Sequence, residues 1–119
     1  MIKLVCFLKR KEGLTREEFY DHWENHHAPL IAGTPELARH IVRYEQLRVT
    51  THADWMGTEG YDGITLQWMT GPEAFEGFIG EPKYAELIAP DERSFLDTSA
   101  LVWMITEAPK VAIDGPTVG

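Results

Sequence analysis

The fold is decided by residues 2–33, which read IKLVCFLKRKEGLTREEFYDHWENHHAPLIAG. Residues 2–9 carry apolar side chains on both faces of a period-two pattern, because Val5 and Phe7 alternate with three further apolar residues. A strand that is apolar on both faces is covered on both sides. We therefore predict a central strand at the start of the chain.

A helix follows this strand. Thr15 and Glu18 have the spacing of a capping box, so the helix is predicted to begin at Thr15. Pro29 removes one intrahelical hydrogen bond, and we expect the helix to kink or stop near His27, with Gly33 ending the segment. The break would come directly after three histidines.

The remaining pattern completes one small domain. The expected elements are strands at 40–51 and 61–70 joined as a hairpin, a helix starting at 70–72, two short helical pieces at 84–88 and 91–96, and a strand at 99–107. The order β-α-β-β-α-β predicts an α+β, ferredoxin-like fold, in which a four-stranded antiparallel sheet carries its helices on one face. Residues 1–107 form the domain, and residues 108–119 are expected to be an arm or a disordered tail.

One face of such a sheet has no helices to cover it. Apolar residues of several strands must therefore be buried elsewhere, most simply against a second copy of the chain. We predict a homodimer packed sheet to sheet.

Composition excludes several classes of protein. The chain has 119 residues, 19 acidic against 11 basic, and a formal net charge of -8, so it lacks the cationic face that nucleic acids require. Apolar runs are far shorter than the roughly 20 residues of a membrane span, and the N-terminus does not resemble a secretory signal. We expect a cytoplasmic protein. The single cysteine, Cys6, excludes an intramolecular disulfide framework.

The first third of the chain resembles the EthD domain family of the dimeric α/β barrel superfamily. The resemblance rests on Phe19, the aromatic Trp23 four residues on, and the sequence His27-Ala28-Pro29. The late stretch PDERSFLD at 90–97 is similar to the acidic and aromatic segment before the family's last strand. The resemblance implies a dimeric α/β barrel over about residues 2–107.

The resemblance also implies a class of chemistry. Relatives in the superfamily include polyketide cyclases, dehydratases, decarboxylases and lactone isomerases that work mostly without a metal or an organic cofactor. We therefore expect a cofactor-independent enzyme acting on an aromatic, polyketide-like or lactone substrate. Two alternatives remain open: a non-catalytic carrier or auxiliary protein of an oxidative degradation pathway, and a monooxygenase-like member of the superfamily.

The predicted catalytic residues are His27, His26 and Tyr44. Both histidines flank the apolar stripe of the helix, where an imidazole is suited to proton transfer, although either could instead stabilise the break at Pro29. His26 and Tyr44 also match positions of a histidine and a pocket tyrosine in isomerase relatives. The tyrosine hydroxyl would donate a hydrogen bond to a developing oxyanion.

Substrate contacts are predicted for Trp23, Phe7, Trp68 and His40, although large rings serve most often as core. No metal site is predicted. His22 and His26 have a spacing that can hold a metal, but their segment reads HWENH and the sequence places no third ligand.

Overall fold

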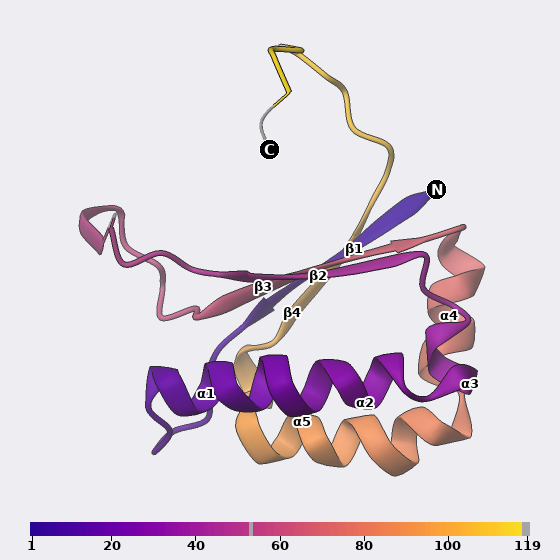
Figure 1. Ribbon diagram of the computed structural model, residues 1–119, viewed down its shortest axis with the longest axis horizontal. Coiled ribbons are helices and arrows are strands. Elements are labelled where there is room, and N and C mark those ends of the chain that lie inside the picture. The colour runs from indigo at the N-terminus through magenta and orange to yellow at the C-terminus, as the bar shows by residue number, and fades with distance from the viewer. Residues whose placement is uncertain (53, 118–119) are drawn as a thin grey trace.

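The computed structural model describes residues 1–52 and 54–117 (Figure 1). The elements in chain order are β1 (Ile2–Leu8), α1 (Arg16–His22), the π-helical turn η1 (Trp23–His27), α2 (Ala28–Ala32), α3 (Pro35–Ala38), β2 (Arg43–Arg48), the short 3-10 turn η2 (Asp54–Met56), β3 (Gly63–Met69), α4 (Pro72–Gly80), the π-helical turn η3 (Tyr84–Ile88), α5 (Ala89–Phe95), the 3-10 turn η4 (Thr98–Ala100) and β4 (Val102–Thr106). Within the described residues, no helix has both the length and the apolar composition to cross a membrane.

The four strands form one antiparallel sheet in the order β2-β3-β1-β4. The helices pack on one face of it, and the other face carries none (Figure 1). This arrangement confirms the predicted α+β, ferredoxin-like fold and the central position of β1.

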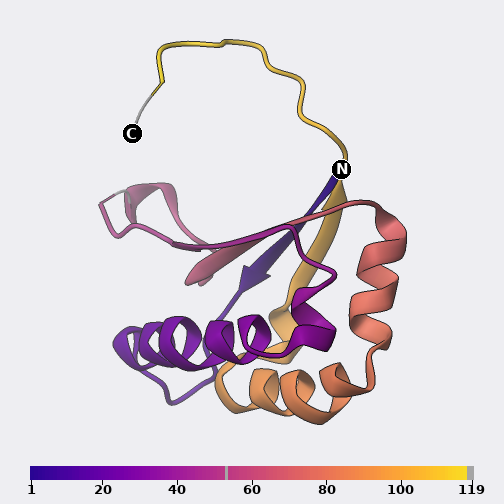
Figure 2. The ribbon, with the colours of Figure 1, turned by 45° about the vertical axis from the view of Figure 1, so that its right-hand side comes forward.

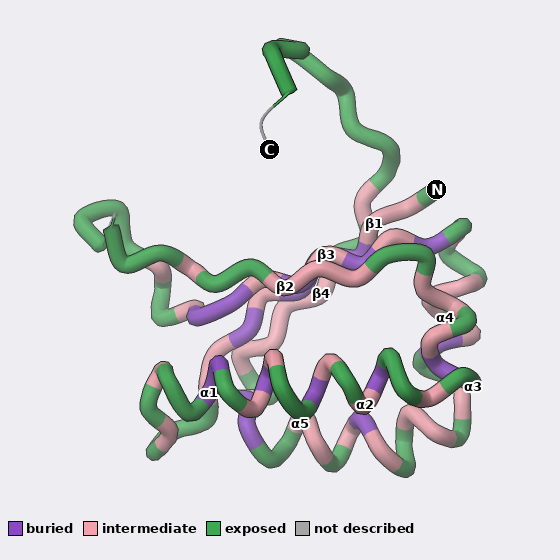
Figure 3. The backbone as a smooth tube through the Cα atoms, viewed as in Figure 1, coloured by how far each residue is buried: buried purple, intermediate pink, exposed green. Residues whose placement is uncertain are grey.

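The core lies between the helices and the inner face of the sheet (Figure 3). Thr15 caps α1 through its side chain, which accepts a hydrogen bond from the backbone N–H of Glu18, and the Glu18 side chain accepts from the Thr15 backbone, so the capping box is present as predicted. This start directs Phe19 and Trp23 inward, and both are fully buried. They pack against Leu4 of β1 and the rest of one continuous apolar cluster.

Of the two outcomes expected at Pro29, a kink or a stop near His27, the stop does not occur, while the predicted end at Gly33 is confirmed. The helix continues without a break from α1 through η1 into α2, and Gly33 is its C-cap. Before Pro29 the backbone widens by one residue, so that the Ala28 N–H bonds the carbonyl of Trp23, five residues back. The π-helical turn accommodates the proline that would have disrupted an α-helix at this point.

Other boundaries also differ from the predicted ones. The second strand is only Arg43–Arg48, because His40 and Ile41 donate their backbone N–H groups to carbonyls of α3 and leave the sheet. The two helical pieces expected at 84–88 and 91–96 are one continuous helix, η3 followed by α5. The strands expected at 61–70 and 99–107 are shorter at both ends.

The outer face of the sheet is apolar and half-exposed. In β3 the buried positions alternate with Ile64, Leu66 and Trp68, which point away from the helices. Residues 108–117 contain no helix or strand, and they extend from β4 on the side of the sheet away from the helices (Figure 2).

Candidate active site

A small cavity lies between the helices and the inner face of the sheet. Apolar and aromatic side chains line most of it, and its ionisable or hydrogen-bonding members include His27, Tyr44, Thr65, Gln67, Tyr84 and Glu92. The volume of the cavity is about 30 Å³, which is room for roughly two water molecules. The cavity therefore combines a few polar groups with an otherwise apolar lining.

His27 is oriented by Asp91 of α5. Its Nδ1 lies 2.7 Å from Asp91 Oδ2, and its side chain is 8% exposed. With the carboxylate ionised, Nδ1–H is the donor, which leaves Nε2 as a proton acceptor. Burial lowers the pKa of His27, although the hydrogen bond and charge of Asp91 oppose the shift. The ring is therefore neutral at pH 7 and available as a base.

The two π-helical turns place this pair. Each precedes an Ala-Pro dipeptide: η1 precedes Ala28-Pro29 and η3 precedes Ala89-Pro90. The Trp23 carbonyl in η1 accepts both from Ala28 N–H and from Gln46 Nε2 of β2, at 3.0 Å. The widened backbone is thus tied to the sheet, and His27 follows at the inner side of the helix. π-helical turns of this kind occur frequently at functional sites.

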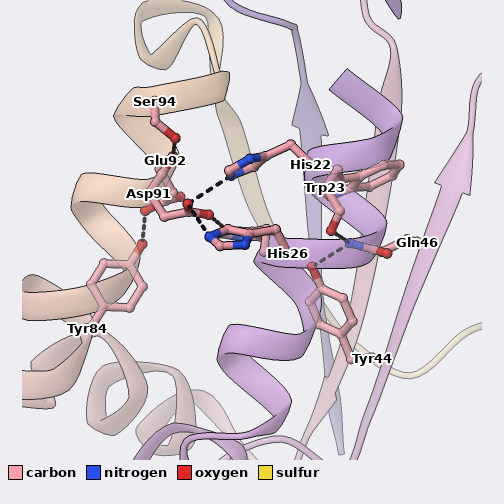
Figure 4. A network of polar contacts seen from close by, with 10 residues as sticks. His22, Trp23, His26, Tyr44, Gln46, Tyr84, Asp91, Glu92 and Ser94 are labelled. Carbon is pink, nitrogen blue, oxygen red and sulfur yellow. Dashed lines mark hydrogen bonds and ion pairs between the residues drawn. The ribbon is translucent and has the colours of Figure 1, made fainter. Parts of the chain in front are cut away.

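Glu92 follows Asp91 and also faces the cavity. Its Oε1 accepts a hydrogen bond of 2.7 Å from the Tyr84 hydroxyl, as the close-up shows (Figure 4). Burial is the main cause that raises the pKa of Glu92; the hydrogen bond from Tyr84 opposes the shift, and the charge of Asp91 adds to it. The neighbouring carboxyl groups therefore differ: Asp91 is the partner of two histidines, and Glu92 has a raised pKa.

Tyr44 of β2 contributes a phenol to the same cavity. Its hydroxyl accepts a weak hydrogen bond of 3.4 Å from Gln46 Nε2. Burial raises the pKa of Tyr44 well above its usual range, so the hydroxyl keeps its proton. It is consequently able to donate a hydrogen bond to a negatively charged oxygen.

Four buried polar atoms around this cavity have no hydrogen-bond partner among the described residues. They are Trp23 Nε1, Thr65 Oγ1, Gln67 Oε1 and Trp103 Nε1, and all four residues line the cavity. Orphaned buried polar groups are rare in native proteins and need an explanation at each occurrence. Water or a polar ligand in the cavity would satisfy them, which makes this space the candidate site.

The structure brings together three of the predicted site residues. His27, Tyr44 and Trp23 all line the cavity. His26 does not: its side chain is 65% exposed, and its Nε2 lies 3.8 Å from Asp91 Oδ1.

The other predicted substrate contacts lie elsewhere. Phe7 and Trp68 are on the outer face of the sheet, where Phe7 packs edge-on against Tyr61 and Trp68 lies under Lys3. His40 is in the turn before β2, not on the strand, and its Nε2 lies 2.7 Å from Glu81 Oε1. These three residues are not brought into the cavity.

Asp91, Glu92 and Tyr84 were missed as site residues. The only signal in the sequence was the acidic and aromatic stretch at 90–97. Asp91 lies 64 positions from His27 along the chain, and only the packing of α5 against η1 joins them.

A groove on the surface lies next to the cavity. It has a volume of about 600 Å³ and runs between α2, α3 and the start of β2, with Pro29 and Val42 among its lining residues. Ile31 and Tyr44 line both the groove and the cavity. These two side chains therefore separate the buried polar groups from the open groove.

A comparison with known families matches the sequence profile of the EthD domain to residues 11–99. The chain belongs to the EthD domain family. This EthD protein is similar to two curated fungal proteins. One is the dehydratase ustZ of Ustilaginoidea virens, 26% identical over 89% of this chain and 82% of the relative. The other is the conidial pigment biosynthesis dehydratase EthD of Metarhizium robertsii, 27% identical over 76% of this chain and 70% of the relative.

Solved structures share the fold at low identity. An EthD family protein from Bacillus halodurans has a TM-score of 0.68 at 20% identity and covers 92% of this chain and 99% of its own. The hydroxynitrile lyase of Passiflora edulis has a TM-score of 0.69 at 14% identity, covering 92% and 94%. A dimeric ferredoxin-like protein from Thermobifida fusca has a TM-score of 0.64 at 16% identity, covering 90% of both chains.

Proposed function

We propose that this EthD protein is a small-molecule enzyme that eliminates water from a β-hydroxy carbonyl substrate by acid–base chemistry of its side chains alone. The observation that carries the proposal is that His27, held by Asp91, and Glu92, held by Tyr84, face one cavity with unpaired polar atoms. Their pKa values are shifted in opposite senses from the usual ones, the arrangement expected of a base and an acid. Two relatives named as dehydratases support this choice of reaction.

Each group has a defined role in the proposed reaction. His27 Nε2 removes the proton next to the carbonyl, and the C–H electron pair forms an enolate. The Tyr44 hydroxyl donates a hydrogen bond to the enolate oxygen. The enolate then expels the β-hydroxyl group, which takes a proton from Glu92 and leaves as water. One proton is gained by His27 and one is lost by Glu92, so the step balances.

The proposed substrate is a flat, mainly apolar molecule with a few oxygens. Rings of Trp23, Phe78 and Trp103 line the cavity, and they favour such a molecule by stacking and area burial. Since the cavity holds only about two waters, a ring-sized substrate enters only when lining side chains move apart. We place the entrance at the groove, with Ile31 and Tyr44 as the side chains that move.

The test uses a β-hydroxytetralone, which becomes naphthol when it loses water. We expect naphthol to form faster than in buffer, and His27→Ala and Glu92→Gln each to lower kcat by about 10²–10⁴-fold. His52→Ala, in an exposed loop, is the matched control and should retain the wild-type rate.

The outcomes separate the alternatives. Full turnover by folded His27→Ala, or loss of turnover in His26→Ala with His27→Ala active, would overturn the assigned base. Binding of tetralones, seen as quenched tryptophan fluorescence, without any conversion would favour a ligand carrier over an enzyme. Oxygen-dependent formation of a naphthoquinone, with one water released per O₂ consumed by the naphthol, would favour a monooxygenase.

We also propose that two copies pair through the outer face of the sheet. This face carries a continuous set of half-exposed apolar residues: Val5, Phe7, Ile64, Leu66, Trp68, Val102 and Met104. An apolar surface of this kind marks an interaction site, and a solved relative of similar fold is dimeric. Sedimentation should give a dimer at micromolar concentration and a monomer for Leu66→Lys. A monomeric wild type would refute the pairing.

A further inference from the structure

Three potential metal ligands converge on the outer side of η1, away from the cavity. His22 Nε2 lies 2.8 Å from Asp91 Oδ1, and His26 Nε2 lies 3.8 Å from the same oxygen. Their three ligand atoms all lie within 4.8 Å of one another. Figure 4 shows both imidazoles turned from one helix toward the carboxylate on α5.

The cluster is held in place before any ion arrives. The two histidines occur one turn apart, and their rings lie 4.7 Å from centroid to centroid. Asp91 is 9% exposed, and its other oxygen is fixed by His27 Nδ1 at 2.7 Å. A partner on the far side of a ligating carboxylate is the type of outer contact that orients ligands in metal sites.

The cluster also has access to solvent. The side chains of His22 and His26 are 29% and 65% exposed, so an ion can enter and keep a water as its fourth ligand. Two imidazoles and one carboxylate with one open position match the ligand sets of zinc sites.

We propose that His22, His26 and Asp91 form a binding site for one divalent transition-metal ion of the Zn²⁺ class, at the back of the proposed base. Mg²⁺ and Ca²⁺ are excluded from this proposal, because they prefer oxygen ligands and the cluster offers two nitrogens. The site assigns a function to His22 and His26, which do not line the cavity. It is independent of the proposed reaction, because binding can be measured without a substrate.

The test is calorimetric titration of the tag-free, full-length protein with ZnCl₂. We expect one ion per chain, a raised melting temperature at saturation, and no comparable heat with MgCl₂. Co²⁺ should give the visible absorption bands of a four-coordinate ion. His26→Ala should weaken Zn²⁺ binding at least tenfold, and Asp91→Asn should weaken it further.

The controls separate the site from ordinary surface histidines. His26 is exposed, so its replacement leaves the fold intact, and His52→Ala removes an exposed histidine outside the cluster. Unchanged affinity in His26→Ala, equal losses in His52→Ala and His26→Ala, or no saturable binding in the wild type would each overturn the proposal. In those cases Asp91 serves only as a hydrogen-bond acceptor.

Discussion

Replacing Asp91 by asparagine isolates the contribution of the carboxylate to the histidine cluster. The substitution keeps the size of the side chain and removes its charge. In the wild type the carboxylate is 9% exposed and accepts from His22 at 2.8 Å and from His27 at 2.7 Å. The two rings bond different oxygens of the carboxylate, and an amide keeps an acceptor at only one of these two positions.

The expected loss of stability follows from these two contacts. A hydrogen bond to a charged group contributes about 1.5–3 kcal/mol, and a neutral one about 0.5–1.5 kcal/mol. Losing one charged bond and weakening the other therefore lowers the free energy of unfolding by about 2–4 kcal/mol. For a chain of this length, this corresponds to a drop in Tm of roughly 8–16 °C.

The loss should also depend on pH. Burial lowers the pKa of His27 in the folded state, so its share of stability is fully present above about pH 6.5 and is lost as the pH falls. The charge and the hydrogen bond of the Asp91 carboxylate oppose this shift, and Asp91→Asn removes the charge and removes or weakens the bond, so the pKa of His27 should fall further. The stability gap between the two proteins should then widen below about pH 6.5, by at most about 1.4 kcal/mol per pH unit.

Urea unfolding followed by tryptophan fluorescence at about pH 8 and about pH 5.5 measures this gap. Asp21→Asn is the matched control, because Asp21 is exposed and bonds only Asn25 among the described residues; it should change the free energy of unfolding by less than about 0.5 kcal/mol. An Asp91→Asn protein as stable as the wild type, or a gap that is the same at both pH values, would refute the reasoning.

Three further predictions test the packing around the cavity. Thr65→Val removes an unpaired buried hydroxyl at equal volume, so chemical denaturation should show unchanged or higher stability, and a loss above about 1 kcal/mol would contradict the orphaned state. Gly63→Ala should cost about 1–3 kcal/mol, because its Cβ would lie 2.6 Å from Cη2 of Trp23, whereas Gly80→Ala, with open space around it, should not destabilise. Burial raises the pKa of the Cys6 thiol to about 11, so iodoacetamide at about pH 8 should label it only after unfolding, and rapid labelling of the native protein would be inconsistent with this burial.

Short-range patterns were sufficient to predict most of the fold. The capping box of Thr15 and Glu18 depends on residues three positions apart, and the alternation in β1 depends on neighbours, so both could be read from the sequence. The continuation of the helix through Pro29 could not be predicted from the sequence. It depends on the hydrogen bond from Gln46 to the Trp23 carbonyl and on the burial of Trp23 under the sheet, which are tertiary contacts.

The candidate site was predictable only in part, for the same reason. His27 and Trp23 were identified from a family motif and Tyr44 from its likeness to a pocket tyrosine of isomerase relatives, and all three line the cavity. Phe7 and Trp68 were placed with them because aromatic residues on the two faces of a strand look alike in a sequence. The helices pack on one face of the sheet, and Phe7 and Trp68 lie on the opposite face.

The sequence by itself determined the order of strands and helices, the start of α1 and membership of a family, because each rests on contacts between residues close in the chain or on a motif. Tertiary structure alone decided which side chains meet in the candidate site. Asp91 becomes a partner of His27 only when α5 packs beside η1, so that residues 64 positions apart lie 2.7 Å from each other. Tyr84 and Glu92 pair within the continuous helix of η3 and α5, and the same packing brings them to the cavity with His27. The same packing buries His27 and Glu92, which shifts their pKa values in opposite senses and turns two ordinary side chains into a candidate base and acid.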